Sequence, residues 1–366
     1  MDLHQPAIVR QWANAGLAVY AGLRPVFNCS GTMWLVMLVG ASAIAQETVL
    51  PFIGTDTVTV QRDREQPVTY NGRILDISGE SLILQRSGIT KTQVFRVSQI
   101  TQLTFLRSSE FEAGLTDRQA GKFSRALRHF DTAIETELRD WAKRELQAVA
   151  AKTCIMMGDR DAAVRRIEAI LETDRRSRHA SLLPLVWDER LLSEECVSGV
   201  ASDLQQQDAP AKRLCAASRL LNDERHRGAA KSALIRLSDS SPPRIADLAK
   251  AQLWRTALLD DPMELSRQLK TWQSELRRMP LVARSGPQYV IACGLQRQHQ
   301  HDQASVAFLW MPFMSPTDAA LSALSMLAAA HCLKASGRVS EAATTKRELL
   351  SRFPKSSAAA TLRAEP

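Results

Sequence analysis

The sequence has few aromatic residues and no block of charge of one sign. Of its 366 residues 5% are aromatic, 45% are hydrophobic and 23% are charged. This balance excludes a disordered chain and a protein embedded in a membrane along most of its length. With alanine abundant, it favours helices that pack closely through small side chains. The net charge of +8 makes a polyanion a possible partner, but basic and acidic residues alternate along the chain, which favours an evenly solvated surface.

The common sequence motifs of catalysis are also missing. There is no Gly-x-Ser-x-Gly elbow, no His-Glu-x-x-His, no glycine-rich phosphate loop and no dinucleotide fingerprint. We therefore predict a protein that is not an enzyme and needs no cofactor. A hydrolase of envelope polymers is a weaker alternative that no motif supports.

Cysteine spacing excludes two further kinds of site. No two cysteines have Cys-x-x-Cys spacing, so neither a zinc ribbon nor a thioredoxin-like centre is indicated. Five cysteines follow the N-terminal segment: Cys154, Cys196, Cys215, Cys293 and Cys332. If the protein is exported, Cys196 and Cys215 are the most plausible disulfide pair, but buried thiols are the favoured interpretation.

Residues 1–45 have the pattern of a signal peptide. Arg10 and Arg24 precede an apolar run over residues 33–40, and Ala43 and Ala45 supply the small residues that signal peptidase accepts. Cleavage before residue 46 and export to the periplasm or envelope of a bacterium are expected. The stretch before the apolar run is long, which leaves open a later translation start or an uncleaved segment. An apolar run of this length falls short of the roughly twenty residues needed to cross a bilayer.

Residues 46–107 are predicted to form a small β module. Short apolar stretches are separated by turn signals at Asn71-Gly72, Ser78-Gly79 and Ser87-Gly88. They predict five short strands in an antiparallel sheet or barrel. Residues 72–84 loosely resemble the first half of an Sm-like or SH3-like barrel, but the second half lacks the Arg-Gly signature of the RNA-binding members. The resemblance therefore implies a shape and no RNA site.

Residues 108–366 are predicted to be helical, and residues 114–134 carry the clearest pattern. Small residues alternate there with two phenylalanines: Gly114, Ala120, Gly121, Phe123, Ala126, Phe130 and Ala133. This pattern resembles the tetratricopeptide repeat, a hairpin of two antiparallel helices. The clearest copies span residues 108–137, 145–174, 286–313 and 324–354. The fold class predicted is α+β and mainly α, a small antiparallel barrel or sheet followed by an α-α superhelix of such hairpins.

The stretch 183–280 keeps helical periodicity without the repeat signature. Pro184, Pro210 and the turn at 238–243 interrupt it, and helices fit at 245–259 and 263–278. One continuous solenoid is the simpler interpretation, and two helical lobes hinged near 238–243 are the alternative. The run 182–187 is predicted to be a packed bend, with Trp187 in the core.

Two groups of residues are candidates for binding. The resemblance implies protein or peptide binding in a concave groove, and Asp117 and Arg118 on the first helix are the expected contacts. Arg175, Arg176 and Arg178 form the densest basic cluster, which could hold a phosphate or carboxylate, although a solvated connection between helices explains it equally well.

The sequence also offers one possible metal motif. His299 and His301 could bind zinc or copper with a third ligand, but they occupy the turn of a repeat, where polar residues are expected. No metal site is predicted.

These observations predict a non-catalytic scaffold or adaptor of the bacterial envelope that binds protein or peptide partners. The alternative is a polyanion-binding envelope protein that recognises acidic glycan, lipid head group or nucleic acid. The affinity of such a protein would fall steeply with salt.

Overall fold

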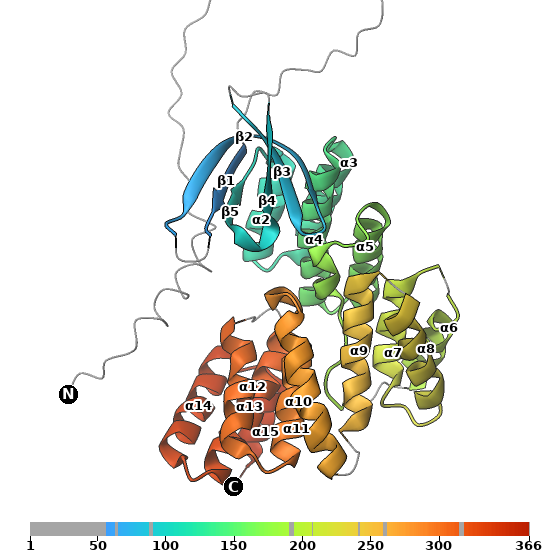
Figure 1. Ribbon diagram of the computed structural model, residues 1–366, viewed down its shortest axis with the longest axis vertical. Coiled ribbons are helices and arrows are strands. Elements are labelled where there is room, and N and C mark those ends of the chain that lie inside the picture. The colour runs from blue at the N-terminus through green and yellow to red at the C-terminus, as the bar shows by residue number, and fades with distance from the viewer. Residues whose placement is uncertain are drawn as a thin grey trace, which may run out of the picture. The chain divides into compact units, whose positions relative to one another are not determined.

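The computed structural model describes residues 56–62, 65–87, 91–189, 194–206, 208–240, 242–258, 262–314 and 318–365. The predicted signal segment 1–45 with its cleavage site, and the predicted turn at Gly88, lie outside these residues. The fold class is α+β and mainly helical, as predicted, with a small antiparallel sheet preceding a run of helices (Figure 1). The described residues up to Arg107 form one compact unit and those from Ser108 form another.

The first unit is a five-stranded sheet in the order β4-β3-β2-β1-β5, with every pairing antiparallel. Its strands are β1 (Asp56–Val60), β2 (Val68–Ser78), β3 (Ser81–Arg86), β4 (Thr92–Arg96) and β5 (Ile100–Thr104). Alternate residues of the strands are buried, as Val58, Ile74 and Leu84 show. This alternation places the core of the module on one face of the sheet.

The predicted turn at Asn71-Gly72 is wrong, because β2 runs straight through it. Gly72 pairs with Asp56 on one side and Arg86 on the other. A Cβ at this position would lie 2.2 Å from the carbonyl oxygen of Gln85, so glycine here allows the close approach of β3. The predicted turn at Ser78-Gly79 is confirmed, with Gly79 at a φ of 56° between β2 and β3.

The second unit consists of α-helices that follow one another with short connections, fourteen of them in its described residues. The helices of its first half are α2 (Ser109–Gln119), α3 (Phe123–Thr136), α4 (Asp140–Met157), α5 (Arg160–Thr173), α6 (Glu194–Asp203), α7 (Pro210–Leu220) and α8 (Arg227–Ser240). Those of its second half are α9 (Pro243–Ala257), α10 (Pro262–Arg278), α11 (Ser285–Arg297), α12 (His301–Met314), α13 (Ala319–Ala335), α14 (Val339–Arg352) and α15 (Ser357–Ala364). Single 3-10 turns, η3 (Arg178–Leu182) and η4 (Leu281–Ala283), lie between α5 and α6 and between α10 and α11.

Helical hairpins occur at the four places where repeats were predicted. They are α2–α3, α4–α5, α11–α12 and α13–α14 (Figure 1). In the first hairpin a Cβ on Gly114 would lie 2.5 Å from the ring of Phe130, so glycine allows α2 and α3 to approach closely. The arrangement is compatible with a helical repeat.

The four hairpins share one backbone turn. A residue with positive φ follows the first helix in each case, namely Gly121, Gly158, His299 and Gly337. The next residue donates its N–H to a carbonyl near the end of that helix: Lys122 to Asp117 (2.8 Å), Asp159 to Cys154 (3.0 Å), Gln300 to Leu295 (3.0 Å) and Arg338 to Leu333 (2.8 Å). This is the Schellman C-cap, which favours glycine at the left-handed position.

Replacing His299 with glycine is expected to stabilise the protein by about 0.5–1 kcal/mol, because His299 holds a left-handed φ of 57° in a turn where the other hairpins have glycine. Urea unfolding of the full chain measures this change. The matched substitution Gly337→Ala, at a φ of 83° with no neighbouring atoms in the way, should destabilise by a similar amount. A loss of stability in His299→Gly would contradict this account of the turn.

The middle of the second unit has three prolines at helix starts, at Pro210, Pro243 and Pro262. Proline suits the first turn of a helix, where its missing N–H has no partner to lose.

The turn near 238–243 is not a boundary between lobes, because α8 packs on α9 and residues 108–365 belong to one compact unit. Helix α9 joins two core clusters, with Ile245 in one and Trp254 in the other. The structure therefore favours the continuous arrangement.

Pro312 lies inside α12. Helix α12 continues through it to Met314. The carbonyl oxygen of Pro312 accepts a hydrogen bond from Arg352 Nη2 at 2.8 Å, which links α12 to the end of α14.

Candidate functional site

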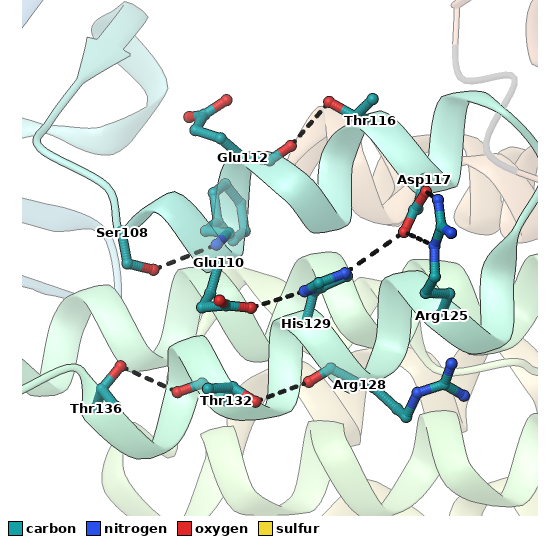
Figure 2. A network of polar contacts seen from close by, with 11 residues as sticks. Ser108, Glu110, Glu112, Thr116, Asp117, Arg125, Arg128, His129, Thr132 and Thr136 are labelled. Atoms are coloured by element: carbon teal, nitrogen blue, oxygen red, sulfur yellow. Dashed lines mark hydrogen bonds and ion pairs between the residues drawn. The ribbon is translucent and has the colours of Figure 1, made fainter.

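Asp117 is part of a polar network inside the first hairpin (Figure 2). It is buried, and its carboxylate accepts two hydrogen bonds from Arg125. His129 Nε2 lies 3.5 Å from the same carboxylate, and His129 Nδ1 lies 2.7 Å from Glu110. The hydrogen bond from Arg125 holds the pKa of Asp117 below its usual range. The carboxylate of Asp117 therefore joins α2 to α3 and is turned to partners within the hairpin.

Arg118, the other candidate on α2, lines a cavity of about 470 Å³ in the second unit. The cavity is walled mainly by apolar side chains from several elements. They include Ile155 and Met156 of α4, Leu182 of η3, Leu183, Pro184, Leu185 and Trp187 of the following loop, Leu248 of α9, Val282 of η4, Met311 of α12 and Leu321 of α13. A concave apolar surface with a few polar groups is the usual form of a binding site.

The loop after η3, residues 183–189, forms one wall of the cavity and is fixed by a buried polar network. The backbone of Val186 exchanges two hydrogen bonds with Ser218 Oγ, at 2.8 and 3.1 Å. Its carbonyl oxygen also accepts from Gln252 Nε2 at 3.0 Å and from Arg255 Nη1 at 2.9 Å. Ser218, Gln252 and Arg255 are all buried. The loop is therefore held to α7 and α9.

Arg255 is the centre of this network. Besides Val186, it donates to the carbonyl oxygens of Ser218 (2.9 Å) and Asp188 (2.9 Å) and to the side-chain oxygens of Gln252 (2.6 Å) and Asn222 (2.7 Å). Burial lowers the pKa of Arg255 to about 10, so the guanidinium is charged at neutral pH. The hydrogen bonds offset the cost of taking this charge out of water.

The run 182–187 is packed as predicted, but Trp187 is half-buried and lines the cavity rather than lying in the core. It lies against both core clusters of the second unit. A Cβ on Gly286 at the start of α11 would lie 1.9 Å from its indole ring, so the ring lies directly on the backbone of α11. Trp187 and Gly286 both line the cavity.

The three arginines of the predicted basic cluster differ in their contacts. Arg178 Nη2 donates to Glu145 of α4 at 2.7 Å, and His179 Nε2 lies 2.9 Å from the same carboxylate. Arg175 and Arg176 are exposed and do not line the cavity. Only Arg178 of the three is therefore engaged with the elements that form the cavity.

Glu145 makes the stability of the second unit depend on pH. Burial opposes its ionisation, but its hydrogen bonds and ion pairs with His179 and Arg178 outweigh burial and lower its pKa to about 2. A carboxyl whose pKa is lower in the folded state stabilises the fold above its unfolded pKa, near 4.5, and loses that contribution as pH falls toward 2.

We expect Glu145→Gln to destabilise the full chain by about 1 kcal/mol at pH 7, because the neutral amide keeps the shape and loses the ion pairs. The difference from wild type should shrink as pH falls from 4.5 toward 2, which urea unfolding at several pH values would measure. Exposed Glu172 on α5 provides the control, since Glu172→Gln should have little effect at any pH. An unchanged difference across this pH range would contradict the role given to Glu145.

Two cations, Arg118 and Lys152, line the cavity. The side chains of Arg118 and Lys152 make no hydrogen bond or ion pair within the described part of the chain. Desolvation, with the positive charges of Arg118 and Arg178, lowers the pKa of Lys152, and Glu145 opposes the shift. Lys152 was not predicted as a site residue, because a single lysine on a helix carries no signal in the sequence.

Of the described residues lining the cavity, Asp318 alone carries a carboxylate. It is the N-cap of α13 and accepts a hydrogen bond from the N–H of Leu321 at 2.9 Å. The lining therefore combines an apolar floor with an excess of positive charge.

Large apolar side chains are exposed at the cavity and next to it. Met156 and Val282 line it and have 57% and 55% of their surface exposed. Their chain neighbours Met157 and Leu281 are also exposed. Exposed apolar groups that continue from a cavity are typical of a surface that another molecule covers.

The described cysteines are free thiols. Cys154, Cys215 and Cys332 are buried and Cys293 is half-buried. Since Cys215 is free, the suggested pairing with Cys196 is not formed, and the side chain of Cys196 lies outside the described atoms. Burial raises the pKa of Cys215, that of Cys332 to about 11 and that of Cys293 to about 12, which keeps these thiols protonated at neutral pH.

The His299 and His301 rings lie 5.8 Å apart, centre to centre, at the α11–α12 turn. Within the part of the chain that the structure describes, no group of three or more His, Cys, Asp or Glu side chains is placed to hold a metal ion. Over the same residues, no helix combines the length and apolar character needed to cross a membrane.

The chain was also compared with known proteins. No family model matches it, and no curated protein has a matching sequence.

Proposed function

We propose that this protein is a non-catalytic adaptor of the bacterial envelope that binds a segment of a partner protein in the cavity of its second unit. We also propose that its hairpins are degenerate tetratricopeptide repeats and that residues 1–45 direct export. The observation that carries the binding proposal is the apolar cavity with Met156 and Val282 exposed at its surface. The fixed loop 183–189 supports it, because a wall held by buried hydrogen bonds needs little ordering when a ligand binds.

A screen of the full chain against a library of short immobilised peptides tests this proposal. The hits are then measured in solution with two matched variants, Met156→Asp at the cavity and Val339→Asp on α14. Val339 is 64% exposed and does not line the cavity. We expect Met156→Asp to weaken binding at least tenfold, about 1.4 kcal/mol, and Val339→Asp to leave it unchanged.

Two outcomes would contradict the proposal. One is that no peptide binds, and the other is that both variants weaken binding equally. Retention of acidic polymers alone, lost as salt rises, would favour the polyanion-binding alternative.

A further inference from the structure

The charges around the cavity carry an inference about the partner's chemistry, which rests on the proposed peptide binding. Arg118 comes from α2 and Lys152 from α4, and neither cation is paired within the described chain. By contrast, Glu145 is held by Arg178 and His179, and Asp318 caps α13. Among the described residues no carboxylate forms an ion pair with Arg118 or Lys152, so an anion from another molecule would be attracted to them.

The floor beside these cations is apolar. Leu182, Leu183 and Leu185 form one wall, and Leu248 and Met311 come from helices distant in the sequence. Such a surface takes up a bulky apolar side chain and excludes water from it. The preferred ligand should thus carry an apolar group and an anion close together.

Exposed apolar residues also adjoin the lining residues in the sequence. Met157, with 41% of its surface exposed, follows Met156 on α4, and Leu281, with 55% exposed, precedes Val282 on η4. A small amphiphile would fill the cavity and leave these neighbours uncovered. A chain segment that is longer than the cavity would cover them.

We infer that the bound segment extends past the cavity, places bulky apolar side chains on its floor, and pairs an adjacent Asp or Glu carboxylate with Arg118 and Lys152. Gln119 and Ser181 also line the cavity and supply polar side chains for the peptide backbone. The carboxylate fixes the position of the segment, and the apolar side chains provide most of its binding energy.

Short peptides with acetylated and amidated ends test this inference, because their only charge is then at the centre. Three matched probes carry Leu-Glu-Leu, Leu-Gln-Leu or Leu-Lys-Leu in the same polar flanks. We expect the full chain to bind the Glu peptide roughly tenfold more tightly than the Gln peptide, which corresponds to about 1.4 kcal/mol. The Lys peptide should bind most weakly.

A charge-reversed protein makes the test specific to the two cations. The double variant Arg118→Glu/Lys152→Glu should prefer the Lys peptide over the Glu peptide. The control Arg347→Glu/Lys355→Glu reverses two exposed charges that do not line the cavity and should keep the wild-type order. Circular dichroism of each variant establishes that the helices are retained.

The outcomes separate this inference from the proposed function. If the Glu and Gln peptides bound equally, or if Arg118→Glu/Lys152→Glu kept the wild-type order of peptide affinities, the preference for an acidic segment would be overturned. The proposal of peptide binding would still stand. If a peptide that ends in a free carboxylate bound more tightly than the capped Glu peptide, the anion would be a chain terminus and the inferred Asp or Glu side chain would be overturned. If decanoate bound and no peptide did, the ligand would be a fatty acid and not a peptide. If no peptide bound at all, both the proposed function and this inference would be contradicted.

Discussion

Replacing Arg255 with leucine is expected to lower the free energy of unfolding of the full chain by about 3 kcal/mol. Arg255 is 8% exposed and donates five hydrogen bonds of 2.6–2.9 Å. Without it, buried carbonyl oxygens in the 183–189 loop and α7 lose a donor. Relief of the buried charge, whose cost is seen in the lowered pKa of Arg255, offsets part of this loss.

Two variants control this measurement, which is made by urea unfolding at pH 7. Arg255→Lys keeps the charge but can donate at most three hydrogen bonds, so it should fall between wild type and Arg255→Leu. Arg347→Ala removes an exposed arginine of α14 and should change stability by less than about 0.5 kcal/mol. If Arg255→Leu were as stable as the wild type, the network would not hold the 183–189 loop.

Replacing Gly286 with alanine is expected to destabilise the protein by about 2–3 kcal/mol. The new Cβ would lie 1.9 Å from the indole of Trp187, between two core clusters that leave the ring little room to move. Because Trp187 lines the cavity, peptide binding should weaken as well. Thermal unfolding and peptide titration measure the two effects.

Gly228→Ala is the matched control for this substitution. Gly228 also lies in the first turn of a helix, α8, but a Cβ there meets no atom within 4 Å. Alanine should therefore stabilise the protein slightly through its better helix propensity. If Gly286→Ala were as stable as Gly228→Ala, the close contact of Trp187 with α11 would be wrong.

Local patterns in the sequence were sufficient to predict much of the fold. The α2–α3 hairpin was predicted from Gly114, Gly121 and Phe130, because the small residues and the turn glycine act within one hairpin. The Asn71-Gly72 turn was wrong for the opposite reason. Gly72 is required by the approach of β3, a contact between strands that a two-residue signal does not report.

The candidate site could be predicted only in part. Arg118 was expected from its place on the first helix of a repeat, and it lines the cavity. Lys152 and Val282 were missed, because the cavity joins residues that lie far apart in the sequence. The loop 183–189 explains why the repeat signature fades between α5 and α11. There the packing depends on a buried network around Val186, and no periodic pattern of small residues records it.

The most direct test of the central claim is photo-cross-linking from the cavity in living cells. The full chain carries a benzophenone side chain in place of Met156 or, as control, of Val339. We predict that position 156 forms an adduct with a discrete polypeptide, that Arg118→Glu/Lys152→Glu reduces this adduct, and that position 339 forms none. No adduct from position 156, or equal adducts from both positions, would contradict the account.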